Sequence, residues 1–141
     1  MTHPVLSKSR QAELGEKLKQ GGLRTTRPRL LLAELLFAQG NRHVTAEKLH
    51  AEAQAAGLKI SQATIYNTLN QFVEAGLLRE VQVDRTRSYF DTNLDRHHHF
   101  YVEEDGDLID IQENAIALDR LPDSPDGYTI AGVDVVIRLR K

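Results

Sequence analysis

The chain contains no cysteine. Disulfide bonds, thiolate metal sites and cysteine nucleophiles are therefore excluded. It also contains no apolar run that approaches the roughly 20 residues needed to cross a bilayer. The N-terminal residues lack the apolar core of a secretory signal. We therefore expect a cytoplasmic protein with no membrane partner, and we expect any metal site in it to use nitrogen and oxygen donors.

The length of 141 residues suffices for one ordinary domain or two small ones. The apolar content of 40% indicates a globular protein. The net charge of −2 conceals an asymmetry. Residues 1–90 contain 13 Lys and Arg against 8 Asp and Glu, whereas residues 91–141 contain 5 against 12. A basic half followed by an acidic half predicts a polyanion-binding module joined to a second module. Two unrelated solvated surfaces are the simpler alternative.

The basic half is predicted to be helical. After a mobile tail at residues 1–8, apolar spacing with Ser or Thr caps and terminal glycines predicts helices at about 9–21, 26–40, 45–57 and 61–76. The first of these helices would be capped by Ser9. In the fourth, the core positions are spaced i, i+4, i+7 and i+8. They are Ile65, Leu69, Phe72 and Val73.

The opposite face of the fourth helix has no acidic side chain in its N-terminal half, where it presents Gln62, Thr64, Tyr66 and Asn67. Such side chains can hydrogen-bond to base edges and phosphates. Residues 77–91 then predict a hairpin with Arg85 and Arg87 at its tip. Helices followed by a basic hairpin are the layout of a winged helix, so we predict binding to double-stranded DNA. A helical domain without a nucleic-acid partner is the simpler alternative.

The acidic half is predicted to contain a β-hairpin. Two strands, at 97–104 and 107–111, would be joined by a two-residue turn at Asp105-Gly106. This register would pair Phe100 with Ile111.

Strand alternation divides the three consecutive histidines. His97 and His99 share a face with Asp110, whereas His98 points toward the apolar face. Imidazoles and a carboxylate on one face are typical of a metal-ligand cluster. A solvated charged turn is the simpler alternative.

A short helix at 113–121 and a long strand at 128–140 complete the prediction. So few elements cannot bury much core alone, and we expect the apolar sheet to pair with a second copy. A dimer, or a higher oligomer, would present two reading helices to a palindromic site. The predicted class is α+β, with a winged-helix DNA-binding domain at 1–91, a hinge at 92–96, and a dimerisation and sensing domain at 97–141.

Together these features resemble the ferric uptake regulator superfamily, from Leu23 to about Leu139. The resemblance implies a dimeric transcriptional regulator, mainly a repressor, that responds to iron or haem and binds A·T-rich palindromic operators. The motifs that carry it are Arg24-Thr25-Thr26-Arg27-Pro28-Arg29, Arg42-His43-Val44-Thr45-Ala46-Glu47, Ala63-Thr64-Ile65-Tyr66-Asn67-Thr68-Leu69, Tyr89-Phe90-Asp91-Thr92-Asn93 and His97-His98-His99-Phe100. The last two look most like the iron response regulator branch.

The resemblance also implies one divalent metal site per subunit, with ligands from both modules. They are His43, Asp91, His97, His99 and Asp110. Three imidazoles and two carboxylates suit Fe²⁺, Mn²⁺ or Zn²⁺. An ion held by both modules would clamp them in one orientation and couple metal occupancy to DNA affinity. In the iron response regulator branch the histidine run is associated with haem, which implies haem ligation by His97, His98 and His99.

For DNA, Arg24 resembles the family's minor-groove residue, Tyr66 its base-contacting tyrosine and Arg29 a backbone contact. The full predicted DNA-binding set is Arg24, Arg29, Ser61, Gln62, Thr64, Tyr66, Asn67, Arg85 and Arg87.

Three departures from the family stand out. The zinc-binding cysteine pairs of many relatives are absent, and Ala117 and Gly132 stand where ligands of an additional metal site are expected. Asn67 follows Tyr66 where many relatives have Arg, which would change the operator that is read.

Two other functions fit parts of the pattern. One is a peroxide-sensing or manganese-sensing repressor of the same superfamily. The other is a mononuclear metalloenzyme. Five ligands would fill most coordination positions and leave little room for a substrate, so we do not expect an enzyme.

Overall fold

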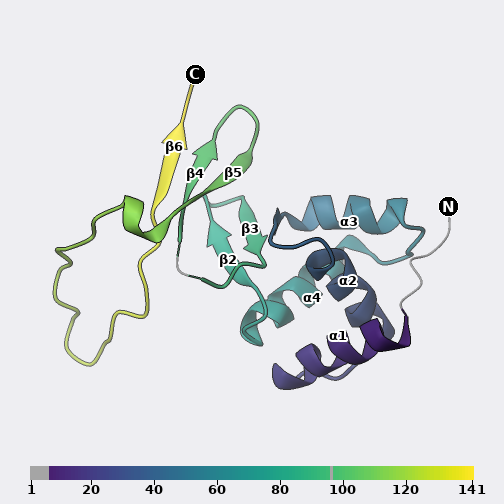
Figure 1. Cartoon of the computed structure of the whole chain (residues 1–141). Helices are drawn as coiled ribbons and strands as arrows, with labels where there is room; N and C mark the ends of the chain where they lie inside the picture. Colours follow the sequence, from purple (N-terminus) through teal and green to yellow (C-terminus); the bar gives the residue numbers. More distant parts are fainter. Residues whose placement is uncertain (1–6, 96) are drawn as a thin grey trace. The chain divides into compact units, whose positions relative to one another are not determined.

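The computed structural model describes residues 7–95 and 97–141, which form two compact units that divide after Leu94 (Figure 1). Within the described residues, the first unit contains four α-helices and a small sheet, and the second contains a three-stranded sheet. The predicted α+β class is confirmed. Most of the predicted tail, residues 1–6, and Arg96 of the predicted hinge lie outside the described residues. The role of residues 92–96 as a hinge stays a prediction.

The four helices form where the apolar spacing predicts them. They are α1 (Lys8–Gln20), α2 (Arg27–Phe37), α3 (Ala46–Ala55) and α4 (Gln62–Glu74). Thr26, Thr45 and Ser61 cap the last three, as predicted. The predicted cap of α1 is wrong. Ser7, not Ser9, has the extended backbone of a cap, and its Oγ accepts the N–H of Arg10 at 3.1 Å.

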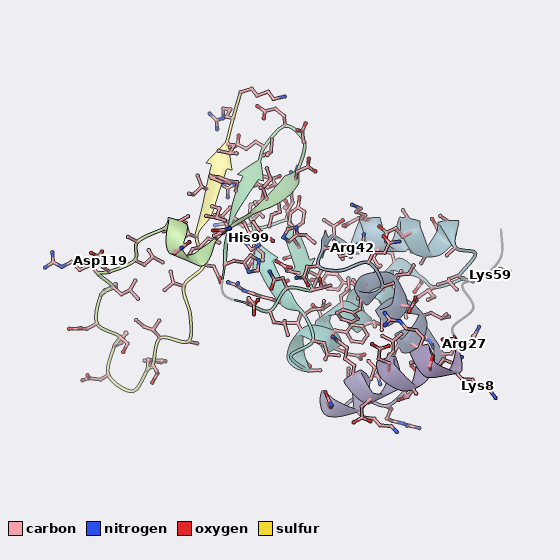
Figure 2. All side chains as sticks on the ribbon, viewed as in Figure 1. Lys8, Arg27, Arg42, Lys59, His99 and Asp119 are labelled. Atoms are coloured by element: carbon pink, nitrogen blue, oxygen red, sulfur yellow. The ribbon has the colours of Figure 1, made fainter. Side chains whose placement is uncertain are left out.

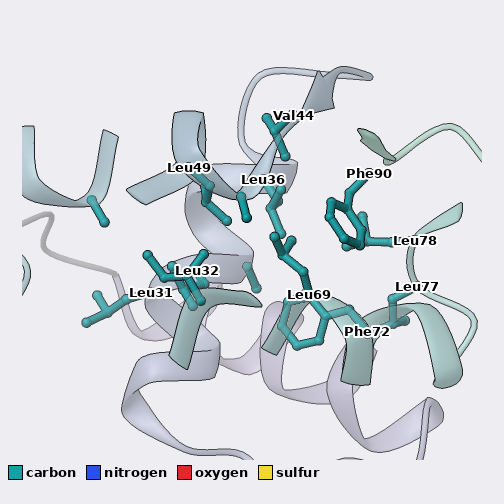
Figure 3. Packing of buried hydrophobic residues seen from close by; sticks show 14 of the residues in the cluster. Leu31, Leu32, Leu36, Val44, Leu49, Leu69, Phe72, Leu77, Leu78 and Phe90 are labelled. Atoms are coloured by element: carbon teal, nitrogen blue, oxygen red, sulfur yellow. The ribbon is translucent and has the colours of Figure 1, made fainter. Parts of the chain in front are cut away.

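The core of the first unit lies between the helices and one face of the sheet. Ile65, Leu69 and Phe72 of α4 are fully buried, whereas Val73, also predicted for the core, is only partly buried. Figure 3 shows leucines of α2 and α3 packed in the same cluster, with Val44 and Phe90 reaching into it from the strands. These two strand residues anchor the sheet to the helices.

The sheet of the first unit has the order β1-β3-β2 and is antiparallel. Its strands are β1 (His43–Val44), β2 (Arg79–Gln82) and β3 (Ser88–Asp91). The β2–β3 hairpin confirms the predicted wing. Strand β1 was not predicted, because two residues are too few for an alternation pattern. It forms by pairing with β3, which places His43 opposite Asp91 and Val44 opposite Phe90.

The sheet of the second unit has the order β5-β4-β6. Its strands are β4 (His98–Val102), β5 (Asp107–Ile111) and β6 (Val136–Leu139). Strand β4 lies at the centre, antiparallel to β5 and parallel to β6. The histidine run therefore leads into the central strand.

The predicted register of β4 and β5 is wrong by two residues. Phe100 pairs with Ile109, not with Ile111. The loop has four residues, 103–106, because Gly106 adopts φ +72° and its N–H donates to the carbonyl of Val102 at 2.8 Å. A two-residue shift keeps each side chain on its predicted face, because side chains alternate with a period of two.

The predicted helix at 113–121 is also wrong. Only a 3₁₀ turn, η1 (Glu113–Ala115), forms, and Ile116 is already extended. Leu118 and Leu121 are exposed, so burial of these two side chains does not offset the cost of nucleating a short helix. The predicted strand at 128–140 shrinks to β6, because only the length of β4 is there to pair with it. Figure 1 shows the chain between η1 and β6 as a wide loop.

Candidate metal centre and nucleic-acid interface

The first unit holds two of the predicted metal ligands side by side. His43 and Asp91 are Cα partners in the β1–β3 ladder, and His43 Nε2 lies 3.3 Å from Asp91 Oδ2. The other carboxylate oxygen, Oδ1, accepts the N–H of Asn93 at 2.9 Å. The Asp91 side chain is 1% exposed. The backbone bond therefore orients a buried carboxylate so that Oδ2 faces the imidazole.

The second unit holds the other three. His97 Nε2 and His99 Nε2 each lie 3.4 Å from the same Asp110 oxygen, Oδ1. His99 is opposite Asp110 in the β4–β5 ladder, and the two imidazole rings meet edge to face at 4.5 Å between centroids. His99 belongs to the central strand (Figure 2). Three donor atoms thus converge on one face, as alternation predicts.

His97 has the arrangement of a metal-ligating histidine. Its Nδ1 lies 2.5 Å from the carbonyl oxygen of Asp95, which leaves Nε2 directed at Asp110. In protein metal sites the imidazole nitrogen that does not bind the metal commonly donates to a backbone carbonyl, which fixes the ring and its tautomer. The contact with Asp95 can do this for His97.

His98 is different from its two neighbours. Its Nδ1 accepts the N–H of Val135 at 3.1 Å. The adjacent backbone bond, from the N–H of His99 to the carbonyl of Val135, is 3.1 Å long. The His98 ring therefore fastens the residue before β6 to β4, on the face away from Asp110. The run therefore divides into two histidines that face Asp110 and one that binds the backbone of Val135.

Each of the five side chains offers one nitrogen or oxygen donor atom. Neutral imidazoles and carboxylates are donors that Fe²⁺, Mn²⁺ and Zn²⁺ accept. The donor set of each unit fits such an ion in chemistry and in local convergence. Among the described residues, neither cluster alone supplies four protein ligands, the number of a closed structural zinc site.

The predicted DNA-reading face is exposed on the surface of α4. Gln62, Thr64 and Asn67 are exposed, and Tyr66 is 48% exposed although it is a large aromatic residue. Ser61 has a local role, because its Oγ accepts the N–H of Thr64 at 3.1 Å. Its hydroxyl also donates to Thr64 Oγ1 at 2.9 Å. The helix cap therefore uses two groups of the predicted set.

Arg29 is held within the protein. One guanidinium nitrogen donates to the carbonyl of Arg24 at 2.9 Å and the other to Gln71 Oε1 at 3.0 Å. The predicted backbone-contact residue thus joins the basic connector to α4. Beside it is an open groove of about 390 Å³, lined by Arg24, Thr26, Pro28, Arg29, Thr64, Asn67, Thr68 and Gln71.

Sequence reasoning missed Gln71. Gln71 lies seven residues after Thr64 and four residues after Asn67, so it is on the same helix face. Continuing the helical period of that face by one turn would have predicted Gln71.

The wing tip is an ordered turn. Asp84 Oδ1 accepts the N–H groups of Thr86 at 2.8 Å and Arg87 at 3.0 Å, and the Thr86 hydroxyl at 2.9 Å. The backbone hydrogen bond from Thr86, more than any other contact, lowers the pKa of Asp84 below its ordinary value of 3.8. Arg85 and Arg87 are exposed on this turn, where phosphates can reach them.

The model of the ferric uptake regulator family matches residues 20–136, which is most of the chain. The chain belongs to the ferric uptake regulator family. Ferric uptake regulation proteins of Shigella flexneri and Vibrio cholerae are 36% and 32% identical to it, over 100 and 102 residues. These matches cover 70% and 72% of the chain and 68% of each relative. Members of this family are metal-responsive transcriptional regulators and not enzymes, so the metalloenzyme alternative falls away.

Solved structures agree. The Vibrio cholerae ferric uptake regulator matches with a TM-score of 0.72 at 24% identity, over 90% of this chain and 98% of that one. The Pseudomonas aeruginosa regulator, solved with manganese, has a TM-score of 0.67 at 25% identity, over 91% and 97%. The Francisella tularensis regulator, solved with iron, has a TM-score of 0.72 at 20% identity, over 85% and 92%. They confirm the fold; assignment to the iron response regulator branch stays a prediction. Among the described residues, no helix is long and apolar enough to cross a membrane.

Proposed function

We propose that this member of the ferric uptake regulator family is a dimeric repressor whose DNA affinity is set by a divalent metal ion. The observation that carries the proposal is the pair of donor clusters. His43 and Asp91 belong to the sheet of the winged helix, whereas His97, His99 and Asp110 belong to the sheet of the second unit.

One ion is proposed to take ligands from both clusters. Asp91 and His97 are six residues apart in the sequence, so the chain between them spans at most about 20 Å and keeps the clusters near each other. Two donors in one unit and three in the other add up to five. Five nitrogen and oxygen donors favour Fe²⁺ or Mn²⁺ over a tetrahedral Zn²⁺ site.

The ion is proposed to act by restraining the two units. Ligands from both units can bind it together only in relative orientations that bring the clusters close. If the orientation that binds the metal is also the one that lets two α4 helices reach one operator, metal and DNA each favour the other by the same factor. Such coupling typically amounts to roughly 5-fold to 150-fold in affinity.

For DNA binding, α4 is proposed to enter the major groove and to read bases through Tyr66, Asn67 and Gln62, which are exposed there. Arg24 is proposed to enter a narrow A·T-rich minor groove. The contacts of Arg29 give it a second role, that of holding the connector of Arg24 to α4. Arg85 and Arg87 on the wing, and the Thr64 and Ser61 side chains at the helix start, are proposed to approach phosphates.

The partner of the second unit is proposed to be a second copy of the chain. Phe100, Ile109 and Ile137 lie across the three strands on one face of the sheet, where Ile109 and Ile137 are 48% and 38% exposed. An apolar sheet face this exposed is unusual in a monomer. Two copies related by a twofold axis would also match a palindromic operator. As a transcriptional regulator, the protein is proposed to work in the cytoplasm.

Iron status is proposed as the signal, and the haem response stays a prediction of the resemblance alone. His98 already uses Nδ1 to accept the Val135 N–H. His97 and His99 face a carboxylate, as metal ligands do. These contacts favour the ion over haem. Peroxide sensing or manganese sensing would use the same donor atoms and would differ in the metal ion that these atoms bind.

The test is DNA affinity by fluorescence anisotropy on an A·T-rich palindrome, with no ligand, Mn²⁺, Fe²⁺, Zn²⁺ and haem in turn. We expect Mn²⁺ and Fe²⁺ to tighten binding, and His43→Ala and His97→Ala to abolish that effect. His50→Ala is the matched control, because His50 belongs to neither cluster. The proposal fails if no form binds specifically, or if the metal response survives both ligand variants. Weakening of DNA binding by haem would support the iron response regulator branch.

A further inference from the structure

We infer that Arg42 is a positioning residue for the His43–Asp91 pair. Arg42 precedes His43 in the sequence. It binds Thr92, the residue after Asp91, and also binds helices α2 and α3. Figure 2 labels Arg42 beside α3 in the first unit. The inference rests on the metal site proposed above and adds a residue that binds no metal itself.

The first part of the device is a backbone clamp. Arg42 directly precedes His43, and Thr92 directly follows Asp91. The Thr92 N–H donates to the Arg42 carbonyl at 3.1 Å, and the Arg42 N–H donates to Thr92 Oγ1 at 2.9 Å. The Thr92 hydroxyl donates to the same Arg42 carbonyl at 3.3 Å. The ends of β1 and β3 are thus locked together one residue beyond the ligand pair.

The second part is the guanidinium of Arg42. Its two terminal nitrogens donate to the two oxygens of Glu52 in α3, at 2.9 and 2.5 Å. One of them also donates to the carbonyl of Leu35, in the last turn of α2, at 3.2 Å. The Arg42 and Glu52 side chains are 22% and 29% exposed, so the fork is half-buried. The planar guanidinium makes two parallel hydrogen bonds to the carboxylate and a third to the carbonyl. Lys cannot reproduce this arrangement.

The two parts form one path from the ligands to the helices. A change in the spacing of His43 and Asp91 moves the ends of β1 and β3, and the clamp passes this movement to Arg42. The fork passes it to α3, which packs against α4. Substitution of the Arg42 side chain removes the fork but keeps the backbone clamp, so it separates the anchoring to α2 and α3 from the pairing of β1 with β3.

The competing interpretation is an ordinary ion pair that stabilises the fold and leaves the ligands untouched. The chain offers a matched control for it. Arg10 Nε donates to Glu34 at 2.7 Å, between α1 and α2, and these side chains are 26% and 23% exposed. This pair has similar burial, although Arg10 meets Glu34 through Nε alone and not as a fork. It lies far from His43 in the sequence.

The experiment compares Arg42→Lys with Arg10→Lys in the full chain. Mn²⁺ affinity is measured by calorimetry, and thermal unfolding is followed without metal. Supporting partners of metal ligands typically contribute 10-fold to 100-fold in metal affinity, and Arg42 acts one residue away, so we expect a loss of roughly tenfold for Arg42→Lys. For Arg10→Lys we expect unchanged Mn²⁺ affinity with a comparable drop in unfolding temperature.

Two further variants keep the test decisive if Arg42→Lys folds poorly. Thr92→Val removes the hydroxyl of the clamp and leaves the Arg42–Glu52 fork in place, and it should also weaken Mn²⁺ binding. The double variant Glu52→Gln/Arg42→Lys should lose little more Mn²⁺ affinity than either single variant, because both changes break the same fork.

The outcomes separate the two proposals. If His43→Ala does not change Mn²⁺ affinity, the metal site and this inference both fall. If His43→Ala weakens Mn²⁺ binding but Arg42→Lys and Thr92→Val match the wild type, only the inference falls. Equal effects of Arg42→Lys and Arg10→Lys on Mn²⁺ affinity would also overturn it, because the pair would then act through stability alone.

Discussion

His43 and Asp91 face each other across two antiparallel strands, and 3.3 Å separates Nε2 of one from Oδ2 of the other. Strand β3 is also the second strand of the wing hairpin. The carboxylate that we assign to the metal therefore ends the same strand that carries the wing. A change at the ligand pair and a change in the wing act on one structural element.

Asp91→Asn tests the carboxylate as a ligand. The amide oxygen of Asn can still accept the N–H of Asn93, so the local turn should survive. The charge and the second donor oxygen are lost. We expect Mn²⁺ affinity to fall by at least about tenfold, since even supporting partners contribute that much. Asp84→Asn is the control, because Asp84 binds only the wing turn; a titration in which both variants weaken Mn²⁺ binding equally would contradict the assignment.

Gly21→Ala should destabilise the first unit. A Cβ at Gly21 would lie 2.9 Å from Ala75 Cβ and 3.1 Å from its carbonyl oxygen, so α1 and the end of α4 would have to separate. Overpacking of this kind costs about 1–3 kcal/mol. Gly15→Ala makes the contrast, because its Cβ would meet Thr25 at an ordinary 3.6 Å inside α1. It should stabilise the unit by roughly 0.5–1 kcal/mol. Urea unfolding of both variants checks the opposite signs; equal shifts would refute the argument.

His98→Leu should loosen β6 without changing Mn²⁺ affinity. The Val135 N–H loses its acceptor, which costs about 1–3 kcal/mol when the donor is left without a partner. Hydrogen exchange in Val136–Leu139 should accelerate. His98→Asn should restore much of the protection, because the Asn oxygen can take the place of Nδ1. Unchanged exchange in His98→Leu, or loss of Mn²⁺ binding in both variants, would show that His98 acts otherwise.

The wing turn should depend on pH through Asp84. Its pKa is lowered in the folded protein, so the ionised carboxylate stabilises the turn at pH values above 3.8, its ordinary pKa. That contribution is lost as the pH falls through the lower folded value. We expect the amide resonances of Thr86 and Arg87 to titrate together, with a midpoint below 3.8. A midpoint at or above 3.8 would mean that the turn does not hold the carboxylate in solution.

The helices of the first unit could be predicted because their signals are local. Thr26, Thr45 and Ser61 cap helices within a few residues of themselves, and Ile65, Leu69 and Phe72 show the helical period directly. The cap of α1 was misplaced because Ser7 and Ser9 carry the same local signal, and only the backbone of the folded chain distinguishes them.

The errors in the second unit have another cause. Residues 113–121 have a helical pattern, but Leu118 and Leu121 are exposed, and residues 128–140 have a strand pattern longer than the strand β4 beside them. Local preference predicts such elements, whereas packing and pairing decide their length. Strand alternation still divided His97 and His99 from His98, because the two-residue register shift leaves every face unchanged.

The sequence by itself determined the four helices, the wing, the faces of the histidine run and the residue types of the donor set, all of which depend on neighbours in the chain. Tertiary structure alone decided that His43 stands opposite Asp91, that His98 holds Val135, and that Arg42 joins Thr92 to Glu52. These contacts join residues 10 to 50 positions apart. No local pattern encodes such pairs, because they form only when the packing of the core brings distant segments together.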